Sequence, residues 1–352
     1  NLNLNFGNLS NIALFRQAYN ATIQDLTLTN VLNTGVRYTG SLIGYGDQVE
    51  ITNVHVAGIV RGNSRMGGLA GYVRNSNLTG CSSEISVTAF GDSHNRADTG
   101  GLIGLAYYST LSESHNRGDV NGYGDNTGGL IGKGYDLDIT GCSNSGSITG
   151  TGGGTGGLAG ILENVTVENC FSEGVVTGED SYTGGLIGYL FGPAEVKSSY
   201  STSTVTGDLR VGGLIGRNSY QTLISDCYST GSVSGTDIVG GLLGANTGYS
   251  TVTNCFSAGP VTGISETTGG LSGYSNWDFN IEFINSYWDI EASGQTDSDG
   301  GEGRMTADMT YPYGADTYLS WNFTSTWAPD VRYEVNNGYP YLGWHETVIS
   351  HL

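Results

Sequence analysis

Three carboxylates stand close together in the segment "DSDGGEG" at residues 297–303, namely Asp297, Asp299 and Glu302. Glycine-containing loops rich in oxygen ligands are the kind of site that Ca²⁺ prefers. The full twelve-residue pattern of a calcium-binding loop is missing here, however. We therefore interpret the segment as a solvated loop, with a calcium site as the alternative, and we predict no other metal site.

Basic side chains are concentrated in the first third of the chain. Enzymes that cleave acidic polysaccharides need a carboxylate pair, or a basic residue that faces a calcium-binding carboxylate cluster. No such acidic cluster accompanies these basic residues, so we predict no catalytic residues and no cofactor. A polysaccharide lyase or hydrolase remains an alternative, and its site would be His94, Arg96 and Asp98 in the segment "FGDSHNRADT" (90–99). The basic residues are Arg61, Arg65, Arg74, His94, Arg96, His115 and Arg117.

A leucine enclosed by glycines recurs along the chain, as in "GGLIG" at 184–188 and again at 212–216. The intervals range from 27 to 33 residues and are most often 28, and a degenerate copy, "IALFRQ", places Leu14 in the same role. Such regularity is the mark of a repeat architecture. The leucines are Leu42, Leu69, Leu102, Leu130, Leu158, Leu186, Leu214, Leu242 and Leu271.

Each repeat also holds a second phrase that is rich in β-branched residues, such as "VENCFSEGVVTG" (167–178) and "VTNCFSAGPVTG" (252–263). Short strands with glycine corners predict one coil of a β-solenoid per repeat, because a single coil cannot bury its own apolar face. We predict an all-β fold with a solenoid at residues 1–284 and a Trp- and Tyr-rich closing module at 285–352. At roughly 4.8 Å per coil, about ten coils make a rod about 48 Å long.

The enclosed leucines are predicted to point into the solenoid and to stack on one another from coil to coil. We expect the flanking glycines to provide corners with positive φ and to let neighbouring backbones approach closely. These glycines are therefore interpreted as structural and not as parts of a nucleotide-binding loop, because no helix follows them.

All five cysteines fall in one column of the aligned repeats, where they exchange with Ser and Val, as a small inward-facing position would. Neighbours in this column would lie about one strand spacing apart with parallel side chains, which is a poor approach for a disulfide. We predict a ladder of free thiols, with intermolecular or strained disulfides as the alternative. The column is Val54, Cys81, Ser114, Cys142, Cys170, Ser199, Cys227, Cys255 and Ser286.

The next residue in each phrase is predicted to point outward, and in five successive repeats it is aromatic. We call these residues the aromatic strip. One interpretation is ring stacking that stabilises the sheet. The other is an exposed contact surface for glycans or a neighbouring subunit. The strip consists of Phe171, Tyr200, Tyr228, Phe256 and Tyr287.

Charge limits the partners. The chain has a net charge of −20 and its only lysines are Lys133 and Lys197. Nucleic acids and anionic membranes are therefore excluded as expected partners. No long apolar run or signal peptide is visible, and the start at Asn1 is what a processed product would have. Sequons occur at Asn8, Asn20, Asn77, Asn164 and Asn322, and the sequence leaves their glycosylation open.

The Gly-Leu-x-Gly phrase in units of this length resembles the GLUG-motif repeats of microbial cell-surface proteins, which include adhesin-like proteins and the stalks of surface peptidases. The resemblance covers about residues 10–275, and "NSYWDIEASGQTDSDGGEGRMTADMT" (285–310) and "YPYL" (339–342) resemble the module that closes such repeats. It implies a right-handed parallel β-helix in an extracellular setting, with no catalytic residues.

Together these features predict a non-enzymatic structural protein of a microbial surface layer, sheath or adhesive fibre. The expected partners are copies of itself, other surface proteins or glycans. A repeat stalk or glycan-binding region of a surface adhesin or peptidase is the alternative. Residues 1–13 alternate like an uncovered edge strand, so we expect self-association there through Leu2, Leu4 and Phe6.

Overall fold

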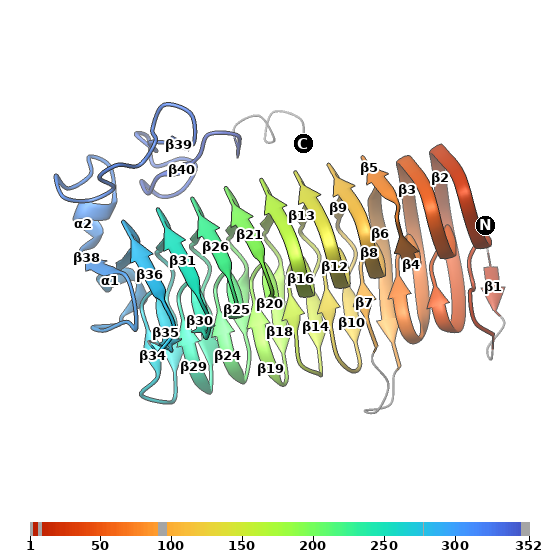
Figure 1. Ribbon diagram of the computed structural model, residues 1–352, viewed down its shortest axis with the longest axis horizontal. Helices are drawn as coiled ribbons and strands as arrows, with labels where there is room; N and C mark the ends of the chain where they lie inside the picture. The colour runs from red at the N-terminus through yellow and green to blue at the C-terminus, as the bar shows by residue number, and fades with distance from the viewer. Residues whose placement is uncertain (1–2, 6–8, 91–96, 277, 346–352) are drawn as a thin grey trace.

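Parallel strands stack along the length of the molecule to form a β-solenoid of about ten coils (Figure 1). The computed structural model describes residues 3–5, 9–90, 97–276 and 278–345, with side chains from residue 9 onward. Within these residues, 38 strands belong to one hydrogen-bonded set. Successive coils keep a register of about one repeat, so that Ile131 pairs with Ala159 and Ala159 pairs with Ile187.

In the first coils, single long strands continue around several corners of the solenoid. Strand β1 (Asn3–Asn5) pairs with β2 (Phe15–Thr39), and β2 pairs with β3 (Ile43–Gly67) along nearly its whole length. Later coils are divided into shorter strands, which form columns that run along the rod.

The column that follows each enclosed leucine contains β4 (Ala70–Arg74), β8 (Ile103–Ser112), β12 (Ile131–Thr140), β16 (Ala159–Glu168), β20 (Ile187–Phe191), β25 (Ile215–Ser219), β30 (Leu243–Asn246) and β35 (Ser272–Ser275). The next contains β5 (Asn77–Thr79), β21 (Ala194–Lys197), β26 (Thr222–Ser225), β31 (Ser250–Thr253) and β36 (Ile281–Ile284). The column that carries the aromatic strip contains β6 (Ser82–Ala89), β9 (His115–Asn116), β13 (Ser143–Asn144), β17 (Phe171–Ser172), β22 (Tyr200–Ser201), β27 (Tyr228–Ser229), β32 (Phe256–Ser257) and β37 (Tyr287–Asp289).

Two further columns complete each coil. One contains β10 (Val120–Gly122), β14 (Ile148–Gly150), β18 (Val175–Gly178), β23 (Thr204–Thr206), β28 (Val233–Gly235) and β33 (Val261–Gly263). The other contains β7 (Thr99–Gly100), β11 (Thr127–Gly128), β15 (Thr155–Gly156), β19 (Ser181–Gly184), β24 (Leu209–Gly212), β29 (Asp237–Gly240) and β34 (Thr268–Gly269).

The enclosed leucines form the centre of the core. All nine, from Leu42 to Leu271, are fully buried in one continuous cluster. The prediction for Leu14 was wrong, because this side chain is 40% exposed. Leu14 lies in the first coil, and no coil in the described part of the chain covers its outer side.

The glycines around each leucine serve close backbone approach. A Cβ on Gly185 would lie 2.0 Å from the carbonyl oxygen of Gly213 in the next coil, and one on Gly188 would lie 2.6 Å from that of Gly160. The prediction that these glycines have positive φ was wrong. Asn and Asp residues, including Asp136 and Asn164, occupy many of the left-handed corners instead. Their short polar side chains tolerate this conformation better than other non-glycine residues.

Strand pairing continues past residue 284. Strand β37 pairs with β32, and β38 (Glu302–Arg304) pairs with β37 at the end of the rod. Trp288 closes the core there, because its ring lies against Gly270 of the preceding coil. The helices α1 (Ile290–Ser293) and α2 (Thr306–Met309) and the antiparallel pair β39 (Trp327–Ala328) and β40 (Tyr341–Leu342) follow.

The chain after α2 turns back along one flank of the solenoid (Figure 1). Trp344 reaches Ser198, where its Nε1–H donates to the backbone carbonyl at 3.1 Å. Trp321, Trp327 and Trp344 of the closing module therefore lie on the flank, against rings of the aromatic strip. No helix in the described residues is long and apolar enough to cross a membrane.

Candidate functional site

The aromatic strip is stacked as expected but is not exposed. Its first four rings, Phe171, Tyr200, Tyr228 and Phe256, lie 4.8 to 5.1 Å apart between centroids and are nearly parallel. They point away from the leucine core, and yet all five residues of the strip, Tyr287 included, are buried. The interpretation as an exposed contact surface was wrong, because the closing module covers the strip.

Residues 309–344 form a second core with the aromatic strip. Trp327 lies on Tyr228 and Phe256, with ring centroids 6.1 and 6.0 Å away, and its Nε1–H donates to Asp226 Oδ1 at 3.0 Å. Burial raises the pKa of Tyr200 and of Tyr228 far above the ordinary value. The many aromatic residues of the closing module were a sequence signal for this contact, since they required an apolar partner surface.

The cysteine column lies inside the solenoid. All five cysteines are buried and none forms a disulfide. Side chains in this column also provide hydrogen-bond partners for backbone groups. The Cys81 N–H donates to Ser114 Oγ at 3.0 Å, and that hydroxyl donates to the Ser112 carbonyl at 2.8 Å. A thiol takes the same place in other coils, as where the Cys142 N–H meets Cys170 Sγ at 3.4 Å. Burial raises the pKa of the Cys142 thiol well above its usual value.

The acidic loop uses its carboxylates for other contacts. Asp297 accepts a hydrogen bond from the Ser298 N–H, Asp299 accepts one from the Ser275 N–H, and Glu302 is paired with Arg304. Nowhere in the described residues does a group of three or more His, Cys, Asp or Glu side chains lie in position to hold a metal ion. The loop therefore forms hydrogen bonds to the preceding coil. Its three carboxylates do not converge on one point, as a calcium site would require.

Of the three residues suggested for an enzyme site, His94 and Arg96 lie outside the described residues. Asp98 is buried, accepts a hydrogen bond from Asn126 Nδ2 at 2.7 Å, and lies 3.4 Å from Arg65 Nε. Desolvation raises the pKa of this carboxyl group, although Asn126 and Arg65 oppose the shift. Arg65 also donates to the Tyr38 hydroxyl at 2.7 Å, so Asp98 belongs to a partly buried chain of polar contacts between coils.

The predicted self-association edge is only partly described. Leu2 and Phe6 lie outside the described residues, and Leu4 lies in β1, where its backbone pairs with Asn33. Beyond β1, the turn at residues 9–12 bonds to Val36, Arg37 and Gly40. Residues 15–31 of β2 have no strand partner on their outer side within the described residues.

The outer face of this first coil exposes several large apolar side chains among polar ones. Phe15 is 43% exposed, whereas Ile43, its register partner in the next coil, is fully buried. The same contrast holds between Leu14 and Leu42, which occupy the corresponding position one residue earlier. The other large exposed apolar side chains of this coil are Leu9, Tyr19 and Leu32.

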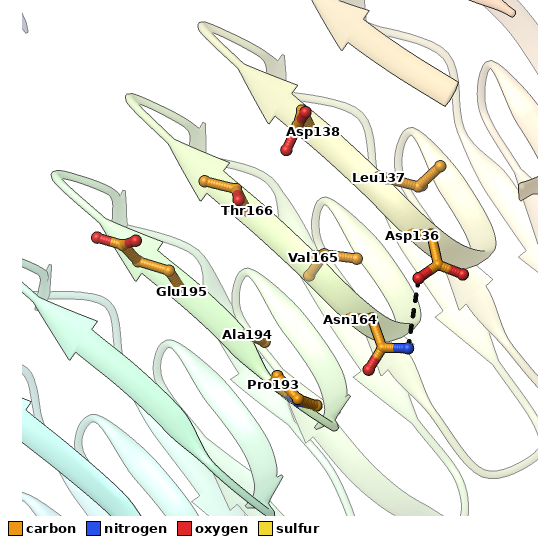
Figure 2. Close-up of a pocket in the computed structure, with 9 residues that line it drawn as sticks. All are labelled: Asp136, Leu137, Asp138, Asn164, Val165, Thr166, Pro193, Ala194 and Glu195. Atoms are coloured by element: carbon orange, nitrogen blue, oxygen red, sulfur yellow. Dashed lines mark hydrogen bonds between the residues drawn. The ribbon is translucent and has the colours of Figure 1, made fainter. Parts of the chain in front are cut away.

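A shallow depression of about 380 Å³ crosses three coils on one flank. Figure 2 shows its side chains in rows, with Asp138, Thr166 and Glu195 in one row. Asp136 and Asn164 belong to another row and form a hydrogen bond of 3.4 Å (Figure 2). Asp136 and Asp138 are exposed to water. This acidic surface is a flank of the repeat, and its side chains, all within the described residues, form no cluster that could hold a metal ion.

A second depression, of about 320 Å³, lies on a different part of the surface and has a mixed lining. Its basic and aromatic members are Lys133, Tyr182 and Tyr189, and Ile161 gives it an apolar wall. Asp125 and Asn126 also line it. No repeat pattern in the sequence predicts this depression, because its residues come from repeat positions that vary from coil to coil.

Comparison with known proteins supports the repeat assignment. The GLUG motif matches this chain at residues 62–88 and 207–234. The chain carries GLUG-motif repeats. Each matched segment ends in the strand-rich half of a repeat, and the second includes the enclosed Leu214, so the GLUG motif here is a packing unit of the solenoid.

One solved structure, reported as a "putative immunoglobulin A1 protease" from Bacteroides ovatus, is 15% identical to the chain. The match covers 84% of this chain and 78% of that one, with a TM-score of 0.33, and at that score it carries no argument about this protein. No curated protein matches the chain.

Proposed function

We propose that this GLUG-repeat solenoid is a non-enzymatic structural protein of a microbial surface layer, sheath or adhesive fibre, and that it associates end to end through its first coil. The observation that carries the proposal is the pair Leu14 and Phe15, which is exposed although its counterparts one coil later are fully buried. A second solenoid placed on this face would bury both side chains and pair the outer edge of β2. The extracellular location rests on the resemblance to surface proteins.

The lateral contact that the sequence suggested has no support now that the closing module covers the aromatic strip. Association along the rod axis through the first coil is therefore the proposed mode of assembly. The alternative, a stalk or glycan-binding region of a surface adhesin or peptidase, needs no contact between copies. Particle size therefore separates these two functions.

The test is sedimentation velocity over a range of micromolar concentrations. We expect the unchanged chain to form ordered oligomers as its concentration rises. The double variant Leu14→Lys, Phe15→Lys should remain monomeric, because stacking would bury two charges. Ile264→Lys is the matched control, since Ile264 is exposed and lies far from the first coil in the sequence. Monomers of the unchanged chain at every concentration would favour the stalk.

A further inference from the structure

The surface around Lys133 concentrates positive charge in a chain that has little of it. The chain has 13 lysine and arginine residues and a net charge of −20. Lys133 lines one depression, and Arg210 and Arg217 lie on the tyrosine rings that form its wall. In the part of the chain that the structure describes, none of these three has a carboxylate oxygen within 4.0 Å. Three cations without ion-pair partners in the described residues therefore lie along one surface of an acidic protein.

Register explains how these groups are spaced. Lys133, Ile161, Tyr189 and Arg217 occupy the same column on four successive coils. At roughly 4.8 Å per coil, the basic residues at the two ends are about 14 Å apart along the rod. Ile161 and Tyr189 lie between them, so the column has a basic residue at each end and apolar or aromatic side chains in the middle.

The aromatic wall is held in place by specific contacts. The Arg217 guanidinium carbon lies 5.1 Å from the Tyr189 ring centre and 5.4 Å from that of Tyr182, and its Nη1–H donates to the Tyr182 hydroxyl at 3.1 Å. Arg210 also lies on the Tyr182 ring, at 5.4 Å. Such contacts fix the side chains before a ligand arrives, which lowers the entropy cost of binding.

The chemistry of the depression fits an acidic sugar. A sugar ring has an apolar C–H face, which Ile161 and the tyrosine rings can cover, and hydroxyl groups, which can donate to Asp125. Its carboxylate would meet Lys133 or Arg217, and charge-assisted hydrogen bonds are the strong ones. The volume of about 320 Å³ lies at the low end of ligand sites, which span roughly 300–1,000 Å³.

The acidic groups nearby do not cancel this charge. Lys133 acts to lower the pKa of Asp98, but this carboxylate is buried. It accepts a hydrogen bond from Asn126 and lies beside Arg65. Asp125 lines the depression and is the one carboxylate among the lining residues. A hydrogen bond from Ser265 and the nearby charge of Arg210 lower the pKa of Asp237, so Arg210 is partly compensated and is not an anion contact of the proposed site. More distant carboxylates act weakly, because charges separated by more than about 8 Å are largely screened at physiological salt.

We propose that this depression and the tyrosine wall beside it bind an acidic polysaccharide across consecutive uronic acid residues, with Lys133 and Arg217 contacting carboxylates of different residues and Ile161 and Tyr189 against the sugar rings. The inference adds a ligand to the structural role proposed above and does not depend on it. A structural protein with this site would attach to acidic glycans along its side while its first coil contacts another copy.

The test uses trigalacturonate, with the neutral galactose trisaccharide as the comparison ligand, in calorimetric titrations of the full chain. We expect trigalacturonate to bind at least about tenfold more tightly than the neutral sugar, since a hydrogen bond to a charged group contributes about 1.5–3 kcal/mol. Lys133→Gln and Arg217→Gln should each weaken trigalacturonate binding by about tenfold. Circular dichroism checks that each variant is folded.

Lys197→Gln is the matched control, because Lys197 is the other lysine, is paired with Glu168 and lies outside the depression. It should bind like the unchanged chain, and so should the first-coil variant, which makes failure of this site distinguishable from failure of end-to-end association. Equal binding of the acidic and neutral sugars, or an equal loss in Lys197→Gln, would overturn the proposal.

Discussion

Removing Trp327 should detach the closing module from the solenoid. The side chain is buried, contacts Tyr228, Phe256 and Trp321, and donates its indole N–H to Asp226. A tryptophan that buries about 200 Å² contributes about 5 kcal/mol at about 25 cal/mol per Å². Large-to-small substitutions of this type cost about 3–5 kcal/mol in practice. We expect Trp327→Ala to lower the free energy of unfolding of the closing module by about 4 kcal/mol.

The solenoid should keep its own stability, because each coil is held by hydrogen bonds to its neighbours. Urea unfolding, followed by tryptophan fluorescence for the module and by far-UV circular dichroism for the strands, should therefore show two transitions in the variant. Tyr249→Ala is the control, because Tyr249 is half-exposed and its ring contacts Phe279 away from the module. A loss below about 1 kcal/mol for Trp327→Ala would refute the reasoning.

Three further predictions concern the interior. The five thiols should be unreactive toward Ellman's reagent in the native protein and should all react after denaturation without reductant; two or fewer would contradict the free ladder. Burial raises the pKa of Tyr200 and Tyr228 above the ordinary value of 10.0, so the stability that they contribute is complete below about pH 10 and is lost as the pH rises beyond it. An alkaline titration of phenolate absorbance should show these two groups ionising only as the protein unfolds, and early ionisation in the folded state would argue against a sealed strip. Leu158→Ala should lower the free energy of unfolding by about 2–5 kcal/mol in urea, since the side chain is fully buried between two like neighbours. A neutral effect would mean that the leucine stack is not the core.

The repeat made the solenoid predictable. A 28-residue period fixes which residues lie above one another, so the burial of the nine leucines and of the cysteine column followed from alignment alone. The first coil broke this rule at Leu14, because periodicity says nothing about the end of a stack. The glycine corners were also misjudged, since Asn and Asp take left-handed corners such as Asp136 and Asn164.

The site was harder to predict because it depends on contacts outside the repeat. Whether Phe171 and Tyr228 meet water is decided by Trp344 and Trp327, which are about a hundred residues or more away in the chain. The basic depression joins Lys133 to Tyr189 across coils, and a non-repeating side chain at a repeat position gives no periodic signal. Sequence pattern therefore predicted the scaffold, while the surface required the structure.

End-to-end stacking through the first coil is most directly tested by negative-stain electron microscopy of the concentrated protein. A single solenoid of about ten coils is a rod about 48 Å long. The unchanged chain should give straight particles longer than a single rod and one rod wide, and the double variant Leu14→Lys, Phe15→Lys should give single rods. Single rods for the unchanged chain, or equally long particles for the double variant, would contradict the account.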